Sequence, residues 1–308
     1  MRQIPFQTVD VFTDSPFAGN PLAVITDARL LTSAEMQQIA REFKYSESTF
    51  ILPPEDPDHT ARVRIFDPAN ELPFAGHPNV GTGFVIVRVG EVLGKPVPQD
   101  ELTFEEIIGL VRLTPVLVND EIRGSRFRVP GAFELLEEIS PKHIAECIGL
   151  DVESIVTTGH KPLRATVGLP SAFAELDSLE SLALASPDTA RFAEANRTYP
   201  SDIDMFALFA YVKTSIEPLT LRARMFAPLS NIPEDPATGS ASAAVGALQV
   251  SLESGDDVRK SIVVHQGVEM GRASRINIEI VNLAGAINDV FVSGNCAFVS
   301  LGVLTLDG

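Results

Sequence analysis

The sequence predicts an α+β protein in which strands outnumber helices. Three observations indicate this class: short alternating apolar and polar runs are frequent, few segments repeat apolar residues at helical spacing, and two similar strand–loop–helix stretches lie far apart in the chain. The chain has 308 residues, of which 45% are hydrophobic and 21% are charged. This length and composition predict a globular protein of two domains with a sizeable core.

The first third of the chain mixes strands and helices. A helix is expected from Thr32, because Glu35 follows at the capping-box spacing and apolar residues then recur with helical period. A second, short helix over 79–90 has Pro78 in its first turn, where proline is tolerated. The strands expected before and between these helices are residues 6–12, 22–25, 46–52 and 61–66.

The rest of the chain continues this mixture. More strands, with turns marked by proline, are expected over residues 91–130. Further helices are expected over residues 141–150, 175–197 and 239–250. The remaining expected strands are residues 205–212, 219–226, 275–280 and 297–306.

Two stretches indicate an internal duplication. RIFDPANELPFAGHPNVGTGFVIV covers residues 64–87, and RMFAPLSNIPEDPATGSASAAVGAL covers residues 224–248. Matching residues stand 160 positions apart without a gap, and they are Arg64 and Arg224, Phe66 and Phe226, Pro68 and Pro228, and Pro73 and Pro233. Without a gap, Ala75 and Asp235 fall at the same place in the two copies.

Charge and cysteine content narrow the function classes. A formal net charge of −17 argues against nucleic acid and anionic membranes as partners. Cys147 and Cys296 cannot form a disulfide framework, which favours a reducing compartment. The start of the sequence has no signal-like apolar region and no apolar run reaches about 18 residues. A cytoplasmic protein is therefore expected.

Each repeated stretch ends in a helix that begins among small residues. Helix starts carry unpaired N–H groups and partial positive charge, so they can hold an anion such as a carboxylate. The small residues placed for this are Gly76, Gly81, Gly83, Gly239, Ser240 and Ser242. Tight packing of a helix on a sheet is an alternative explanation for the same residues.

The candidate chemical groups also have plain structural explanations. His77 at a helix start could be a structural hydrogen-bonding residue, and Asp235 could be an N-terminal helix cap. Glu47, between two serines at the start of a strand, could be a solvated turn residue. The five histidines are scattered, and no set of ligand residues has the spacing of a metal site.

Several separated motifs, in order along nearly the whole chain, resemble the phenazine-biosynthesis PhzF-like family, relatives of diaminopimelate epimerase. These motifs are VDVFTDSPFAGNPLAVI (9–25), SESTFIL (46–52), ELPFAGHPNVGTG (71–83), EDPATGSASAA (234–244) and HQGVEMGR (265–272). The resemblance implies two pseudo-symmetric domains, each a barrel-like, mostly antiparallel sheet around a central helix, with the active site between them. The domains are expected at residues 1–118, completed by the strand 297–308, and at residues 125–293.

The resemblance also implies the site residues. It places a single acid/base at Glu47, with His77, Asp235 and Ser240 as further catalytic residues. The expected substrate-binding residues are Asn20, Gly76, Gly239, Gln266 and Gly267. Epimerase relatives use a cysteine in each loop, whereas Cys147 and Cys296 lie in neither loop here. Racemisation by two thiols is therefore excluded on residue chemistry.

These observations lead to one expected function and two alternatives. The expected function is a cofactor-independent isomerase that moves a proton and a double bond in a small carboxylate-bearing metabolite, with neither metal nor organic cofactor. The alternatives are a non-catalytic small-molecule binding protein on the same fold, and a racemase or epimerase with bases other than cysteine. A homodimer is suggested by family analogy.

Overall fold

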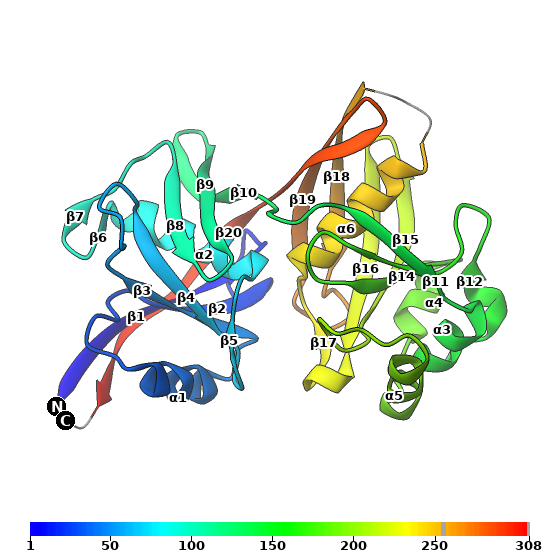
Figure 1. The fold of residues 1–308 in the computed structure, drawn as a ribbon, viewed down its shortest axis with the longest axis horizontal. Coiled ribbons are helices and arrows are strands. Elements are labelled where there is room, and N and C mark those ends of the chain that lie inside the picture. Colours follow the sequence, from blue (N-terminus) through cyan, green and yellow to red (C-terminus); the bar gives the residue numbers. More distant parts are fainter. Residues whose placement is uncertain (254–256, 307–308) are drawn as a thin grey trace. The chain divides into compact units, whose positions relative to one another are not determined.

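The structure, a computed structural model, describes residues 1–253 and 257–306. The chain falls into two compact units: unit 1 comprises Met1–Arg128 with Ser293–Gly308, and unit 2 comprises Val129–Val292. Each unit consists mainly of strands, and each surrounds one long helix, α2 or α6 (Figure 1). The predicted α+β class is therefore confirmed. Within the described ranges, no helix combines the length and the apolar character needed to cross a membrane.

Unit 1 is a closed barrel. Neighbouring strands pair in the order β1–β2–β3–β4–β8–β9–β10–β20, and β20 pairs in turn with β1. The strand bounds are β1 Arg2–Val11, β2 Asn20–Ile25, β3 Glu47–Leu52, β4 Ala61–Phe66, β8 Leu102–Glu106, β9 Gly109–Val118, β10 Glu121–Arg128 and β20 Ala286–Leu306. The expected boundary near residue 118 falls at the end of β9, and β10 continues unit 1 because it pairs with β9.

Helix α2 (Gly76–Val89) lies inside this barrel. Its residues are buried from His77 to Val87, as expected for a helix that is apolar on all sides. Glycines let it lie against the wall, because a Cβ on Gly81 would stand 2.6 Å from the Leu22 side chain. Pro78 lies in its first turn, as predicted.

The remaining elements of unit 1 are peripheral. Helix α1 (Ser33–Phe43) begins with the predicted capping box, in which Thr32 and Glu35 bond reciprocally. Its apolar face, with Met36, Ile39 and Ala40, packs in a cluster with buried residues of the barrel strands. The short strands are β5 Glu71–Leu72, β6 Glu91–Val92 and β7 Lys95–Pro96.

Unit 2 repeats this design around helix α6 (Gly239–Ser251). Its main strands pair in the order β11–β13–β14–β15–β16–β18–β19–β20, while β12 pairs with β14 and β17 pairs with β16. The bounds are β11 Glu134–Glu138, β12 Ile155–Val156, β13 Leu163–Thr166, β14 Ser171–Leu176, β15 Leu208–Ile216, β16 Leu219–Ala227, β17 Ile232–Asp235, β18 Asp257–Gln266 and β19 Ser274–Leu283. Helix α6 is buried from Ala241 to Val250.

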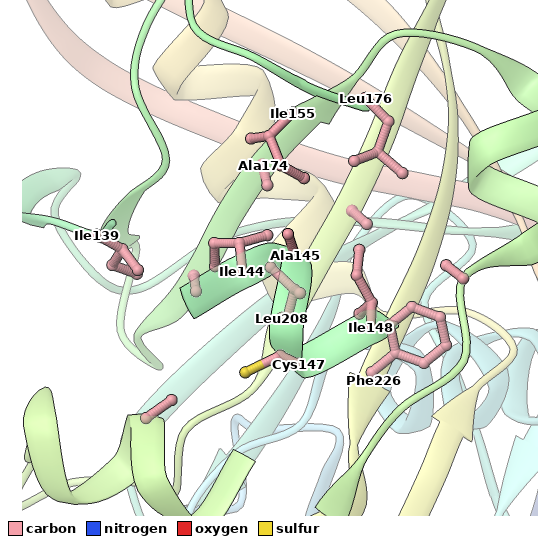
Figure 2. Close-up of a cluster of buried hydrophobic side chains, with 14 of the residues drawn as sticks. Ile139, Ile144, Ala145, Cys147, Ile148, Ile155, Ala174, Leu176, Leu208 and Phe226 are labelled. Atoms are coloured by element: carbon pink, nitrogen blue, oxygen red, sulfur yellow. The ribbon is translucent and has the colours of Figure 1, made fainter. Parts of the chain in front are cut away.

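Three further helices cover one side of unit 2: α3 (Pro141–Ile148), α4 (Leu179–Leu184) and α5 (Thr189–Thr198). Figure 2 shows the core that they form with the strands, in which Cys147 of α3 lies among apolar side chains such as Phe226 of β16. Burial raises the pKa of the Cys147 thiol to about 12. This cysteine is therefore a core residue with an inert thiol.

The helix expected over residues 175–197 is wrong in its extent. Residues up to Leu176 belong to β14, and the helical part is divided into α4 and α5. The break falls at Pro187, because the residue before a proline is driven out of helical geometry. Asp188 then caps α5 by accepting hydrogen bonds from Ala190 and Arg191.

The two units share one plan of strand pairing, so the predicted duplication is confirmed. In unit 1 the pairs β1–β2, β3–β4 and β8–β9 are antiparallel, and the pairs β2–β3 and β4–β8 between them are parallel. From β13 to β19 the pairs β13–β14, β14–β15, β15–β16, β16–β18 and β18–β19 follow the same sequence of senses. In both units a short strand, β5 or β17, then leads to the central helix.

The repeat is not free of gaps, because the loop of unit 2 is longer. Ile65 pairs with Leu72 in unit 1, and Met225 pairs with Asp235 in unit 2. The matched strand residues are 160 apart, but their loop partners are 163 apart. A short 3-10 turn at Pro228–Ser230 accompanies the three additional residues.

The prediction that Ala75 and Asp235 occupy the same place is therefore wrong. Ala75 is the N-cap of α2, and its counterpart is Thr238, the N-cap of α6. His77 likewise corresponds to Ser240, the second residue of its helix. Asp235 is consequently not the N-cap of α6.

The same ion pair holds the loop in each unit. Arg64 donates two hydrogen bonds of 2.6 Å to Glu71, and Arg224 donates two of 2.8 Å to Glu234. Arg224 also donates to backbone carbonyls of residues 182, 183 and 185. Two parallel N–H bonds fix both distance and orientation, so each pair ties the loop before the central helix to a barrel strand.

A half-buried acid whose two carboxyl oxygens are shielded from solvent lies on the inner face of β8. Leu102 and Phe104 are fully buried, and Glu106 follows at the same strand period. Burial raises its pKa from 4.5 to about 8, although the neighbouring Asn79 side chain of α2 opposes the rise. Glu106 therefore carries a proton at neutral pH, which avoids a buried charge.

We predict that Arg224→Ala lowers the free energy of unfolding by about 3–5 kcal/mol, because it leaves Glu234, whose side chain is mostly buried, without its partner. Urea denaturation measures this loss. The control is Arg112→Ala, which removes an exposed pair with Glu101 and should cost at most about 1 kcal/mol. Equal losses in the two variants would contradict the role given to Arg224.

The proton on Glu106 predicts a pH-dependent stability. Between pH 4.5 and about 8 the folded chain retains a proton that the unfolded chain has released. The free energy of unfolding therefore falls as pH rises through this range, by up to about 1.4 kcal/mol per pH unit. In Glu106→Gln this component should be absent, as measured by urea denaturation across the range. Glu105→Gln is the control. Glu105 lies on the opposite face of β8, where it accepts hydrogen bonds from the backbone N–H groups of Glu55 and Asp56. The Glu105→Gln protein should therefore still lose stability as pH rises through this range.

Candidate active site

The two central helices begin without a side-chain cap. The peripheral helices α1, α4 and α5 are capped by Thr32, Ser178 and Asp188. At the start of α2 the cap residue is Ala75, which has no polar side chain, and at the start of α6 the Thr238 hydroxyl does not cap. Neither helix has an acidic residue in its first turn. Their first N–H groups therefore keep their partial positive charge, and each start can receive an anion.

Glu47 and His77 meet at the start of α2. Glu47 is the first residue of β3, where it pairs with Leu22 of β2, and its side chain is 17% exposed. His77 is the second residue of α2, and its Nε2 lies 3.4 Å from Glu47 Oε2. The structure thus brings together two of the residues predicted for catalysis.

The imidazole of His77 is neutral. Burial lowers the pKa of His77 to about 3, because a charged ring would lose its hydration inside the barrel. A neutral ring therefore faces the carboxyl group of Glu47. A neutral imidazole can donate one hydrogen bond, and it can orient a neighbouring carboxylate without adding charge.

Asn20 supports the same corner of unit 1. It is fully buried at the start of β2, and its Oδ1 accepts a hydrogen bond of 3.1 Å from Ser46. Ser46 directly precedes Glu47. Asn20 therefore holds the segment that leads into Glu47.

The duplication shows that the acid is present in only one unit. Ser48 pairs with Phe66 in unit 1, and Leu208 pairs with Phe226 in unit 2. The residue before each is Glu47 in unit 1 but Ala207 in unit 2. Strand pairing alone cannot explain Glu47, since the same barrel position accepts alanine.

In unit 2, Asp235 is held by its own loop and by β18. Its Oδ2 accepts a short hydrogen bond from the Thr238 hydroxyl. Gln266, the last residue of β18, donates to the Asp235 carbonyl over 2.7 Å and accepts from the Thr238 N–H over 3.1 Å. The loop before α6 is thereby joined to the barrel wall.

Gly267 and Ser274 complete this support. Gly267 has a φ of +72°, and a Cβ there would stand 2.6 Å from the Pro236 carbonyl oxygen. Ser274 donates a hydrogen bond of 2.8 Å to the same carbonyl. A side chain at residue 267 would therefore push the loop away, which gives this glycine a structural reason beside its predicted substrate contact.

Gly239 and Ser240 form the first turn of α6, as Gly76 and His77 form that of α2. Gly239 is buried, whereas Ser240 is partly exposed. The predicted site residues thus divide into two groups. Glu47, His77, Asn20 and Gly76 surround the start of α2, and Asp235, Ser240, Gly239, Gln266 and Gly267 surround the start of α6.

Neither cysteine belongs to these groups. Cys147 lies in the helical core, and Cys296 in β20 is 6% exposed with a thiol pKa raised by burial. Across the described part of the chain, no three His, Cys, Asp or Glu side chains gather as metal ligands do. The expectation of a reaction without metal or cofactor stays a prediction.

The sequence interpretation missed Thr238 and Asn79. Thr238 follows Asp235 at a spacing of three residues in a helix-start motif, which is a signal for a side-chain contact as well as for a cap. Asn79 is a fully buried polar residue of α2 whose amide donates to the Ala75 carbonyl over 3.1 Å. An amide in an otherwise apolar helix was the available signal.

Comparisons with known proteins agree with this architecture. A relative named as an uncharacterized isomerase from Mesorhizobium japonicum is 33% identical over 297 residues, which cover 96% of both chains. The trans-2,3-dihydro-3-hydroxyanthranilate isomerase of Pseudomonas aeruginosa is 31% identical over 300 residues, covering 96% of this chain and 98% of that one. The crystal structure of a Bacillus anthracis phenazine biosynthesis protein of the PhzF family has the same fold, with a TM-score of 0.87, 22% identity and coverage of 99% and 100%.

The family model described as phenazine biosynthesis-like protein matches residues 9–302. This match spans the motifs of both units, including the segments that carry Glu47, His77, Asp235 and Ser240. The chain belongs to the phenazine biosynthesis-like protein family, PhzC-PhzF.

Proposed function

We propose that this protein is an isomerase that moves a proton and a double bond within a small, unsaturated carboxylate. The observation that carries this proposal is the Glu47–His77 pair at the uncapped start of α2. A partly buried carboxylate beside a neutral ring is a suitable acid/base, and a helix start nearby can hold an anionic group. Relatives at 33% and 31% identity are named as isomerases, which supports this reaction class.

The proposed reaction needs one proton carrier. The Glu47 carboxylate takes a proton from a substrate carbon, the electron pair of that C–H bond shifts into the neighbouring double-bond system, and a new double bond forms. The protonated Glu47 then returns the proton to the far carbon, which leaves the carboxylate as it began. A single carrier agrees with the duplication, because the equivalent position in unit 2 is Ala207.

His77 has a supporting role in this proposal. Its neutral imidazole touches Glu47 and can donate a hydrogen bond to the carboxylate or to the substrate, without itself titrating near neutral pH. Charge that develops on the substrate during proton removal is stabilised by N–H groups at a helix start. Asp235 and Ser240 are proposed to act on the same substrate, with Gly76 and Gly239 as backbone donors.

The proposed substrate class follows from the site and from the relatives. A carboxylate is the anion that uncapped helix starts suit, and the Pseudomonas aeruginosa relative is named for an isomerisation of trans-2,3-dihydro-3-hydroxyanthranilate. That compound and related unsaturated carboxylates are the first probes. Deuterium uptake from heavy water into a probe would support the isomerase, whereas binding without uptake by any probe would favour a non-catalytic binding protein.

Glu47→Gln should abolish proton exchange, with a loss on the order of 10²-fold or more, because an amide cannot carry the proton. Mass spectrometry of the probe in heavy water measures the exchange. Glu55→Gln is the matched control, since Glu55 is an exposed acid of the same unit. A folded Glu47→Gln protein with wild-type exchange would overturn the assignment.

Asp235→Asn should still bind the probe but turn it over more slowly, on the order of tenfold or more. The variant keeps an oxygen that can accept from Thr238 but loses the negative charge. Isothermal titration calorimetry and the exchange assay separate binding from turnover. Asp202→Asn, at an exposed acid of unit 2, serves as the control, and full activity of Asp235→Asn would remove this residue from the chemistry.

A further inference from the structure

We propose that Thr238 and Gln266 are positioning residues that fix the orientation of the Asp235 carboxyl group. This inference rests on the proposed function, because it gives Asp235 a task that needs a fixed geometry. Gln266 then belongs to the protein scaffold, although the family resemblance implies a contact with substrate.

The backbone decides the orientation of the Gln266 amide. The Thr238 N–H can only donate, so the atom that it meets at 3.1 Å is the Gln266 oxygen. The Asp235 carbonyl can only accept, so the atom at 2.7 Å is the Gln266 nitrogen. A flipped amide would place two donors together and two acceptors together. The side chain therefore has one orientation.

That orientation in turn decides where the Thr238 hydroxyl points. The second N–H of the Gln266 amide donates to Thr238 Oγ1 over 3.0 Å. With that oxygen accepting from Gln266, its own proton is directed to Asp235 Oδ2. The bonded oxygen of Asp235 acts as the acceptor of this bond. The backbone thus fixes the Gln266 amide, the amide fixes the Thr238 hydroxyl, and the hydroxyl bonds one oxygen of Asp235.

Burial makes Gln266 unsuited to contact with a substrate. Its side chain is fully buried, and its oxygen and both amide hydrogens have partners in the loop between Asp235 and Thr238. It stands at the end of β18, paired with Ala223 of β16 and Ser274 of β19. Two neighbouring strands therefore hold the residue that orients this loop.

The arrangement also departs from what helix stability alone would favour. Threonine is a common N-cap whose oxygen accepts from the helix, but the hydroxyl of Thr238 makes no capping bond to α6. Unit 1 forms the corresponding helix start with Ala75 as N-cap and Leu72 in place of Asp235. The fold therefore reaches this junction without a hydroxyl or an acid, and both occur together in unit 2 alone. A role in holding the acid explains this difference.

Three variants of the full-length protein test the proposal. Thr238→Val removes the hydroxyl at nearly constant volume, Thr238→Ser keeps it, and Thr214→Val removes an exposed hydroxyl of β15 as the control. We expect kcat for proton exchange with trans-2,3-dihydro-3-hydroxyanthranilate to fall about 10- to 100-fold in Thr238→Val, with KM within about twofold, because orientation and not binding is lost. Thr238→Ser should restore kcat to within about threefold of wild type.

Crystal structures of the wild type and the Thr238 variants give a readout that does not depend on turnover. The Asp235 carboxylate should keep one position in the wild type and in Thr238→Ser but rotate in Thr238→Val. A fully active Glu47→Gln protein would contradict the proposed function. The structures would still test the position of Asp235, because they do not depend on turnover. Wild-type kcat in Thr238→Val, or an unmoved carboxylate in its structure, would overturn the inference.

Discussion

A helix that is buried on every side must satisfy its first peptide N–H groups without bulk water. Both central helices of this protein face that requirement. The peripheral helices α1, α4 and α5 meet it with side-chain caps, whereas α3 begins with a proline and has no such cap. Helices α2 and α6 also lack side-chain caps, so their first N–H groups are available to an anionic ligand, as the proposed function requires. Glu47 lies near the start of α2 and Asp235 lies in the loop before α6.

The loops that lead into the two helix starts are held by strong, repeated contacts. Arg64 and Arg224 each form two parallel bonds to a glutamate, and each guanidinium also stacks over a phenylalanine two residues further along the strand. A planar guanidinium suits both contacts at once. The ends of these loops are therefore fixed on the barrel, which is what a functional group at a helix start requires for precise geometry.

Chemical differences between the two copies are as informative as their similarity. The barrel position of Glu47 holds alanine in unit 2, and the loop position of Asp235 holds leucine in unit 1. Each acid has its own support: His77 and the Asn20–Ser46 contact beside Glu47, and Thr238 with Gln266 beside Asp235. The shared fold supplies two similar helix starts, and the residues that differ give them different chemistry.

The sequence by itself determined the class of fold, the duplication, and the motifs that carry the candidate residues. Strand alternation, the Thr32 capping box and the repeated Arg and Phe positions are local signals, because they depend on spacing along one element. Only the tertiary structure decided the true correspondence of the copies, which places Asp235 opposite Leu72 and not opposite Ala75. An insertion in a loop does not change the pattern of apolar residues in the flanking elements, so the sequence pattern does not reveal it. Strand pairing shows it, because the pairing fixes which residues lie opposite each other. The contacts of Gln266 with Asp235 and Thr238 were hidden for the same reason: they join residues 28 and 31 positions apart, and only folding brings them together.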